Sequence, residues 1–83
     1  MASVYVLRSL KTGKKYVGST SWHPTERLVE HNAGKVPWTR THRPLEIIYT
    51  EDFISIELAR KREQFFKTGK GRFVLESLLG GKR

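Results

Sequence analysis

The 83 residues of this sequence allow one domain with a single small core. The sequence contains no cysteine, which excludes a disulfide framework and a thiolate metal site. No apolar run approaches the roughly 20 residues that span a bilayer, and the first residues do not resemble a signal peptide. We therefore expect a cytoplasmic protein without membrane association.

The charge is strongly positive, with 16 Lys and Arg against eight Asp and Glu and a formal net charge of +8. Most of the excess falls in residues 1–43, which carry eight basic and two acidic side chains. A small domain with such a charge is expected to bind polyanions, of which nucleic acid is the commonest. The alternative is a highly charged surface that is merely solvated.

Two strand-prone runs open the chain, residues 4–7 (VYVL) and 15–18 (KYVG), with the turn-rich residues 9–13 between them. The short connection predicts an antiparallel hairpin. Tyr5 and Tyr16 would then lie on neighbouring strands and could share a face, although the sequence does not fix the register.

A helix is predicted to begin near His23, because Pro24 suits the first helical position, and to end by residue 34. Arg27 and His31 are spaced i and i+4 on this helix, so their side chains project from one face. We expect residues 35–44 (KVPWTRTHRP) to form an exposed loop that serves as a contact surface.

A third strand is predicted at residues 45–49 and is expected to end before Glu51 and Asp52. Leu45, Ile47 and Tyr49 would form one face of this strand. Ser55 is a plausible N-cap for a helix over residues 56–67. That helix has an apolar stripe of four residues, Leu58, Ala59, Phe65 and Phe66.

Gly69 and Gly71 are expected to interrupt the helical pattern before a last short helix over residues 73–79. The predicted order is strand, strand, helix, strand, helix, helix. This order indicates an α+β fold with a small three-stranded antiparallel sheet flanked by helices. We expect one domain over residues 1–80, followed by a short basic tail at 81–83.

Glu63 borders the apolar stripe of its helix, where a carboxylate needs a positive partner. Lys67, four residues later, can supply that partner as an ordinary surface ion pair. The alternative is that Glu63 binds a hard divalent cation through oxygen, as one-carboxylate magnesium sites do. Periodicity alone favours the ion pair.

The other candidate side chains also have structural interpretations when each is taken singly. His31 can interact with a helix C-terminus, Arg27 can be a solvated cation, and Tyr5 and Tyr16 can be half-buried sheet residues. Together they can do more. An arginine can stabilise charge on a phosphate, a tyrosine or histidine can relay a proton, and a carboxylate-bound metal can polarise a phosphodiester. These are the groups that phosphodiester hydrolysis needs.

No Walker-type loop, GxGxxG, HExxH or G-x-S-x-G motif is present, so nucleotide hydrolysis and acyl transfer lack support.

At these positions the sequence resembles the GIY-YIG nuclease superfamily, and most of all its small single-domain members related to the catalytic domain of the excision-repair endonuclease. The two signature tripeptides appear as residues 4–6 (VYV) and 16–18 (YVG), separated by nine residues. The Arg-x-x-x-His element is residues 27–31, and residues 59–63 match the place of the family's metal-binding glutamate.

The resemblance implies hydrolysis of DNA phosphodiesters with Mg²⁺ or Mn²⁺. It implies that Glu63 holds the metal, which reverses the preference for an ion pair, and that Arg27 stabilises the scissile phosphate. Tyr16, assisted by Tyr5 or His31, would activate or position the attacking water, with the identity of the base left open.

The sequence departs from the family at residues 4, 6 and 17, where valine replaces glycine or isoleucine at backbone or core positions. A late asparagine of larger members has no counterpart, and residues 67–72 (KTGKGR) occupy that region. We expect no appended recognition module and therefore little sequence specificity. Substrate contacts are predicted at Gly18, Lys35, Trp38, Arg40, Arg43, Lys67, Lys70 and Arg72, with Trp38 either stacking on a base or anchoring its loop.

The resulting hypothesis is a metal-dependent DNA endonuclease, structure-selective and acting in repair or recombination. The alternative is a non-catalytic nucleic-acid-binding module that acts with a partner protein. An RNA substrate is not excluded, and a partner protein or a weak homodimer is compatible with the apolar helix ends and Trp38.

Overall fold

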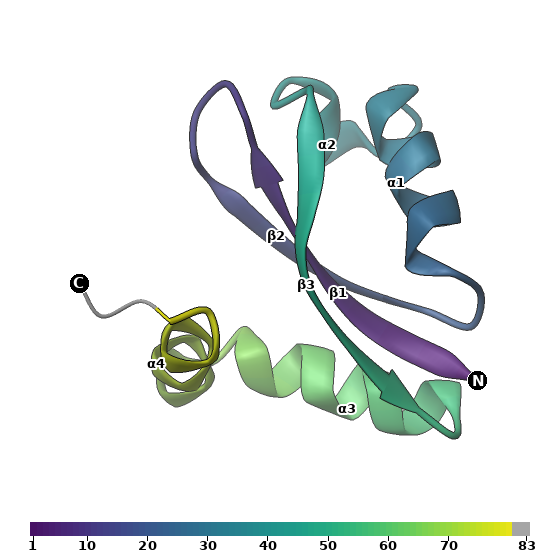
Figure 1. The fold of residues 1–83 in the computed structure, drawn as a ribbon, viewed down its shortest axis with the longest axis vertical. Coiled ribbons are helices and arrows are strands. Elements are labelled where there is room, and N and C mark those ends of the chain that lie inside the picture. The colour runs from purple at the N-terminus through teal and green to yellow at the C-terminus, as the bar shows by residue number, and fades with distance from the viewer. Residues whose placement is uncertain (81–83) are drawn as a thin grey trace.

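A three-stranded sheet forms the centre of the molecule in a computed structural model that describes residues 1–80 (Figure 1). The strands are β1 (Ala2–Ser9), β2 (Lys15–Thr20) and β3 (Leu45–Phe53), arranged in the order β2-β1-β3. Both neighbouring pairs are antiparallel, so the predicted hairpin and sheet are confirmed. β2 is therefore an edge strand.

Four helices lie on the two sides of this sheet (Figure 1). α1 (Pro24–Asn32) and the short α2 (Pro37–Arg40) lie on one side, and α3 (Ile56–Phe66) and α4 (Gly69–Leu78) on the other. The α+β class and the order of the main elements are as predicted. The predicted tail at 81–83 lies outside the described residues.

Alternation along β1 divides the core into two parts. Val4 and Val6 face α3 and α4, where they pack with Ala59, Phe66 and Leu75. The intervening side chains face α1 in a second cluster formed by Tyr5, Leu7 and Leu45. Because side chains of a strand alternate between faces, this one strand, buried at every residue except Arg8, supplies both cores.

A bulge in β3 changes which face its residues present. Leu7 pairs with Ile47, but the next pair is Val6 with Tyr49, so Ile48 is an extra residue. An inserted residue shifts the alternation by one position. The prediction that Tyr49 shares a face with Leu45 and Ile47 is therefore wrong, and Tyr49 packs against the α3 side. β3 also continues through Glu51 and Asp52, which were expected to end it.

The exposed loop predicted for residues 35–44 instead contains α2, which begins at Pro37 because proline suits a first helical turn. The glycines expected to interrupt the last helix lie inside α4, whose N-cap is Thr68. A Cβ added at Gly71 would lie 1.7 Å from the carbonyl oxygen of Phe65. Glycine is needed there so that α4 can start against the end of α3.

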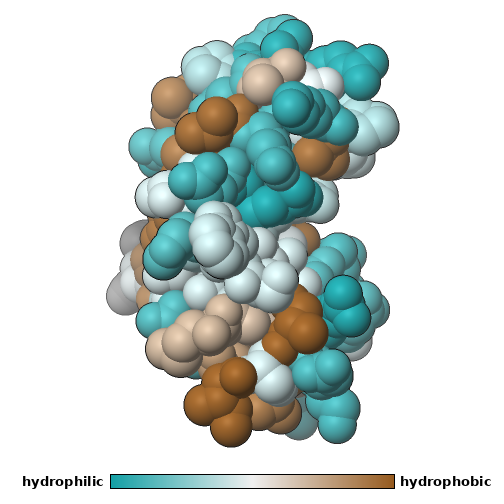
Figure 2. All heavy atoms as spheres, turned by 90° about the vertical axis from the view of Figure 1, so that its right-hand side faces the viewer, coloured by the Kyte–Doolittle hydropathy of each residue, from teal (hydrophilic) through white to brown (hydrophobic). Residues whose placement is uncertain are grey.

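Leu58, which was assigned to the apolar stripe of its helix, is exposed instead of buried, and so are Phe73 and Leu78 of α4. Met1 and Ile54 are also exposed, at the N-terminus and just before α3. Figure 2 shows apolar side chains gathered at that end of the molecule and hydrophilic ones over the α1 half. Among residues 1–80, no helix has the length and apolar character needed to cross a membrane.

Candidate active site

The two signature tyrosines lie on the same face of the sheet. Tyr5 pairs with Gly18 across the β1–β2 ladder, and Leu7 pairs with Tyr16, so both tyrosines face α1. A Cβ added at Gly18 would lie 2.5 Å from the Tyr5 hydroxyl oxygen. Glycine at position 18 therefore leaves the space that the Tyr5 hydroxyl occupies above β2.

Tyr5, His31 and Thr39 form a buried polar chain on this face. The Tyr5 hydroxyl lies 3.1 Å from His31 Nε2, and His31 Nδ1 lies 2.7 Å from Thr39 Oγ1. All three side chains are fully enclosed, with at most 1% of each residue exposed. The helix α1 positions His31 at its last turn, and α2 positions Thr39 above it.

The contacts at the two ends of this chain favour one direction for its donors. With the Thr39 hydroxyl donating to the carbonyl of Val36 at 3.3 Å, its Oγ1 accepts from His31 Nδ1–H. Nε2 of a neutral imidazole then carries no proton and accepts the hydrogen bond of the Tyr5 hydroxyl. The buried polar chain is thus ordered and fully satisfied.

Both titratable members of the chain are held neutral. Burial lowers the pKa of His31 below its ordinary value, and the positive charge of Arg27 lowers it further. Burial raises the pKa of the Tyr5 hydroxyl, although Arg27 opposes this change. At neutral pH the chain therefore holds an uncharged imidazole and an uncharged phenol.

Arg27 connects this chain to solvent. Its Nε lies 3.4 Å from the Tyr5 hydroxyl oxygen, a long contact, and its Nη1 pairs with Glu30. A guanidinium has five N–H donors, so these two contacts leave donors for another group. With 34% of its side chain exposed, Arg27 can bind an anion without leaving its position.

Glu63 lies on the opposite face of the sheet, on α3. Ser19 pairs with Val4 and therefore faces α3, where its hydroxyl donates to Glu63 Oε1 at 2.5 Å. Lys67 Nζ donates to Glu63 Oε2 at 2.7 Å, as expected for the i,i+4 pair. Within residues 1–80, no hydrogen bond or ion pair joins Glu63 to Tyr5, Arg27 or His31.

The carboxylate of Glu63 fits a divalent cation that takes one protein ligand. Its side chain is 15% exposed, and the ammonium of Lys67 already places a positive charge on one of its oxygens. No group of three or more Asp, Glu, His or Cys side chains that could hold a metal occurs in residues 1–80. A magnesium ion with one carboxylate, water and substrate oxygens needs no such group.

Tyr16 lies where the two faces meet. Its ring centroid is 5.0 Å from that of His31, and Lys67 Nζ lies 5.9 Å from the Tyr16 ring centroid. Tyr16 is half-buried, and its hydroxyl makes no hydrogen bond to another residue in the described part of the chain. Of the two tyrosine hydroxyls at the site, that of Tyr16 is therefore the one left available to bind a water.

Trp38 is held beside Tyr16 instead of projecting freely. Its ring centroid is 5.6 Å from that of Tyr16 and 4.2 Å from that of His42, with which it is stacked at 5°. The indole is nevertheless 43% exposed. Trp38 is thus anchored in its segment and also presents indole surface to solvent, so loop anchoring and base stacking are both compatible with its position.

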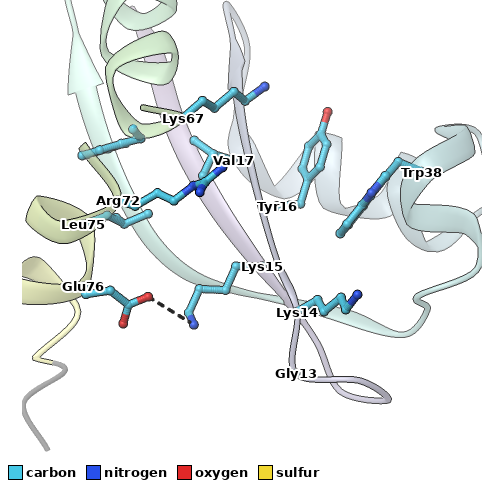
Figure 3. A pocket seen from close by; sticks show the side chains of 11 residues that line it. Gly13, Lys14, Lys15, Tyr16, Val17, Trp38, Lys67, Arg72, Leu75 and Glu76 are labelled. Carbon is cyan, nitrogen blue, oxygen red and sulfur yellow. Dashed lines mark ion pairs between the residues drawn. The ribbon is translucent and has the colours of Figure 1, made fainter. Parts of the chain in front are cut away.

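A cavity of about 830 Å³ adjoins Tyr16 and runs along β2 (Figure 3). Every residue from 13 to 17 lines it, and successive residues of a strand face opposite sides, so it follows the edge of β2. We call it the β2-edge groove; Figure 3 shows Tyr16 and Trp38 on one side of it and Leu75 and Glu76 on the other. Of the predicted contacts it gathers Trp38, Lys67 and Arg72.

The remaining predicted contacts lie elsewhere. Arg40 and Arg43 line a second cavity of about 540 Å³ together with Lys11. Their guanidinium groups hold the chain near α2, since Arg40 donates to the Gly34 carbonyl and Arg43 to the Arg40 carbonyl. Lys35 and Lys70 are exposed and line neither cavity.

Ser19 and Thr39 were missed by sequence reasoning, together with the groove residues Lys14 and Lys15. Ser19 follows the second tripeptide directly, so a donor one position after Gly18 could have been considered. Thr39 lies in the segment expected to be a loop, and no local pattern indicates that it reaches His31.

Known proteins resemble this chain in sequence and in fold. Residues 1–74 match the family model described as the GIY-YIG catalytic domain. The UPF0213 protein spr1390 of Streptococcus pneumoniae is 39% identical over 70 residues, covering 83% of this chain and 69% of that protein. A UPF0213 protein of Staphylococcus haemolyticus is 38% identical over 66 residues, covering 78% of each.

The fold is also similar to the solution NMR structure of the UPF0213 protein BH0048 from Bacillus halodurans. The TM-score is 0.55 at 33% identity, and the alignment covers 98% of this chain and 88% of that one. The match over residues 1–74 confirms the resemblance carried by the two tripeptides, and the chain belongs to the GIY-YIG family of nuclease catalytic domains.

Proposed function

We propose that this chain is a metal-dependent endonuclease that hydrolyses DNA phosphodiesters with little sequence preference of its own. The observation that carries the proposal is the arrangement around β2. A buried, neutral polar chain fixes Arg27 on one face, a carboxylate that accepts a cation lies on the other, and Tyr16 lies between them. Membership of a nuclease family supports phosphodiester hydrolysis in general.

Arg27 binds and stabilises the scissile phosphate. The Tyr5 hydroxyl accepts from its Nε and holds the guanidinium, whose remaining N–H donors are left for an anion. Donors placed before the reaction begins stabilise developing negative charge without reorganising. Tyr5 and His31 thus act as positioning residues, because neither is exposed to a substrate.

Tyr16 orients the attacking water and accepts its proton. Tyr5 and His31 are fully buried and already bonded to each other, whereas the Tyr16 hydroxyl has no partner in residues 1–80. Tyr16 also lies beside Lys67, whose Nζ is 5.9 Å from the Tyr16 ring centroid, on the side of the sheet edge that carries Glu63. This geometry favours Tyr16 over the other two candidates as the base.

Glu63 would hold Mg²⁺ or Mn²⁺, with Ser19 orienting the carboxylate through Oε1. The metal would polarise the phosphodiester and stabilise the leaving oxygen. Lys67 must then move from Glu63 Oε2, which its flexible side chain and 45% exposure allow.

Cleavage of supercoiled plasmid and of branched or flapped duplexes, each with Mg²⁺, Mn²⁺ or EDTA, tests this function. The wild type is compared with Glu63→Ala and with Lys61→Ala, an exposed residue of the same helix. We expect metal-dependent nicking by the wild type and by Lys61→Ala and none by Glu63→Ala, whose DNA binding is largely retained. Equal loss of binding and cleavage in Glu63→Ala would contradict the metal role.

The second candidate is a non-catalytic nucleic-acid-binding module that acts with a partner protein. The Glu63–Lys67 ion pair favours it, because a carboxylate neutralised by lysine needs no metal. Binding to every substrate without cleavage of any would support this candidate. A role in repair, structure selectivity, action on RNA, a weak homodimer and a cytoplasmic location stay predictions.

A further inference from the structure

We propose that the β2-edge groove binds an unpaired strand of nucleic acid next to the scissile phosphate; this proposal rests on the proposed function. The groove reaches Tyr16, which belongs both to the site and to the groove wall. A strand lying in the groove would therefore run directly into the active site.

The charges at the rim of the groove match a phosphodiester backbone. Four basic residues line it, Lys14, Lys15, Lys67 and Arg72, against one acid, Glu76. Lys15 pairs with Glu76 at 3.5 Å and Lys67 with Glu63, but the side chains of Lys14 and Arg72 make no hydrogen bond or ion pair within residues 1–80. Two cations on opposite sides of the groove are thus available to phosphates.

The interior of the groove matches exposed bases instead of a duplex. Tyr16 and Trp38 form one wall, and Val17, Phe66 and Leu75 complete the apolar lining. A duplex turns its phosphates outward and would contact only the rim, whereas a single strand can place bases against aromatic and apolar side chains. The volume of about 830 Å³ is that of a small-molecule site, which suits one or two nucleotides.

Protection of an edge strand is the other known use of lysines in such a position, since charge discourages pairing with a second chain. That use explains Lys14 and Lys15 on the strand side. It does not explain Arg72, which projects into the groove from α4, or the aromatic wall. The combination of the two sides is what favours a nucleic-acid strand.

Fluorescence anisotropy tests the proposal with three labelled DNA probes: a single strand, a blunt duplex, and a duplex with a single-stranded overhang. The wild type is compared with the double variant Lys14→Ala/Arg72→Ala and with the matched control Arg60→Ala/Lys61→Ala. All four residues are exposed, and the control removes the same charge from α3. Measurements are made in EDTA, so that no probe is cut.

We expect the groove variant to bind the single strand and the overhang at least about fivefold more weakly than the control variant does. It should bind the blunt duplex about as well as the control variant does. Its salt dependence for the single strand should be less steep by ~0.7 for each lost contact in log–log slope. Equal losses in the two variants would show a general charge effect, and a larger loss on the blunt duplex would show that the groove holds a duplex. Either result would overturn the proposal.

The failure of this proposal is distinguishable from that of the proposed function. Binding in EDTA does not depend on cleavage, so a protein that never cuts DNA can still show the groove effect. Conversely, the wild type could nick plasmid while the groove variant binds every probe as well as the control variant does. The protein would then be a nuclease without this groove site.

Discussion

The two sides of the active site are built differently. On the α1 face, the buried polar chain is closed to solvent, neutral and ordered, and every donor has one acceptor. On the α3 face, Glu63 and Lys67 are partly exposed and form an ion pair. In the proposed function, a metal ion takes the place of the Lys67 ammonium. A preorganised half can fix a catalytic arginine, while an adaptable half can admit a metal and a substrate. In the proposed function, both halves act on one phosphate at the edge strand β2.

Of the changes below, removal of the Arg27 guanidinium should have the largest effect, which is on the rate of cleavage. We expect Arg27→Ala to slow cleavage by ~10²-fold or more, the scale of losing one transition-state donor. Single-turnover cleavage assays with saturating DNA measure this rate. Arg27→Lys should recover little, because an ammonium lacks the planar fork that Tyr5 and a phosphate share. A loss no larger than that of Lys61→Ala would make Arg27 an ordinary surface cation.

Opening the buried polar chain should mainly reduce stability. Thr39→Val keeps the shape of the side chain but leaves His31 Nδ1–H buried without an acceptor, at a cost of ~1–3 kcal/mol in the free energy of unfolding. Urea denaturation measures it. The matched control is Thr25→Val, which makes the same exchange at an exposed position of α1. If both variants lose the same free energy of unfolding, the hydrogen bond between Thr39 and His31 does not stabilise the protein.

The neutral state of His31 predicts a pH dependence of smaller size. Because its pKa is lowered in the folded protein, the unfolded chain binds more protons below the ordinary value of 6.5. The contribution of His31 to stability is therefore complete above about pH 6.5 and decreases as the pH falls below it. Urea denaturation across this range should show a steeper decrease for the wild type and the exposed control His23→Gln than for His31→Gln. Equal slopes in all three would mean that His31 is not held neutral.

Breaking the pair on the adaptable face should have the smallest effect on stability. We expect Lys67→Ala to lower the free energy of unfolding by ~0.5 kcal/mol or less, as for exposed i,i+4 pairs. The same change frees Glu63, so Mn²⁺ should bind at lower concentration, as measured by isothermal titration calorimetry. Lys61→Ala serves as the control. An unchanged affinity for Mn²⁺ would separate Lys67 from the metal site.

Much of the fold could be predicted from the sequence, because hairpin spacing, proline positions and apolar periodicity are local signals. Ser55 was expected to cap α3, and its side chain accepts from the Leu58 amide. The errors lie where distant contacts override local pattern. The bulge at Ile48 moves Tyr49 to the other face, and the contact of Gly71 with Phe65 makes a glycine part of a helix.

The same division holds for the site. Arg27 and His31 could be placed on one face from their spacing, and their contacts with Tyr5 agree with that placement. Glu63 could be paired with Lys67 by the i,i+4 rule. Ser19 and Thr39 could not be found in this way, because their partners lie 44 and 8 residues away across different elements. Neither Ser19 nor Thr39 has a local sequence signature of its own.

The extra residue in β3 also provides a contact to the helix that carries Glu63. Beyond Ile48 the strand turns Tyr49 and Glu51 toward α3, where Arg62 donates to Glu51 at 2.8 and 3.1 Å. Although burial by itself raises the pKa of Glu51, the hydrogen bonds from Arg62 and Tyr49 bring it below its usual value. Arg62 precedes Glu63, so this pair adds a contact between β3 and α3 next to the residue that carries the carboxylate. An extra residue in the strand farthest from β2 thereby places Glu51 on the face where it holds α3, the helix whose carboxylate lies beside β2.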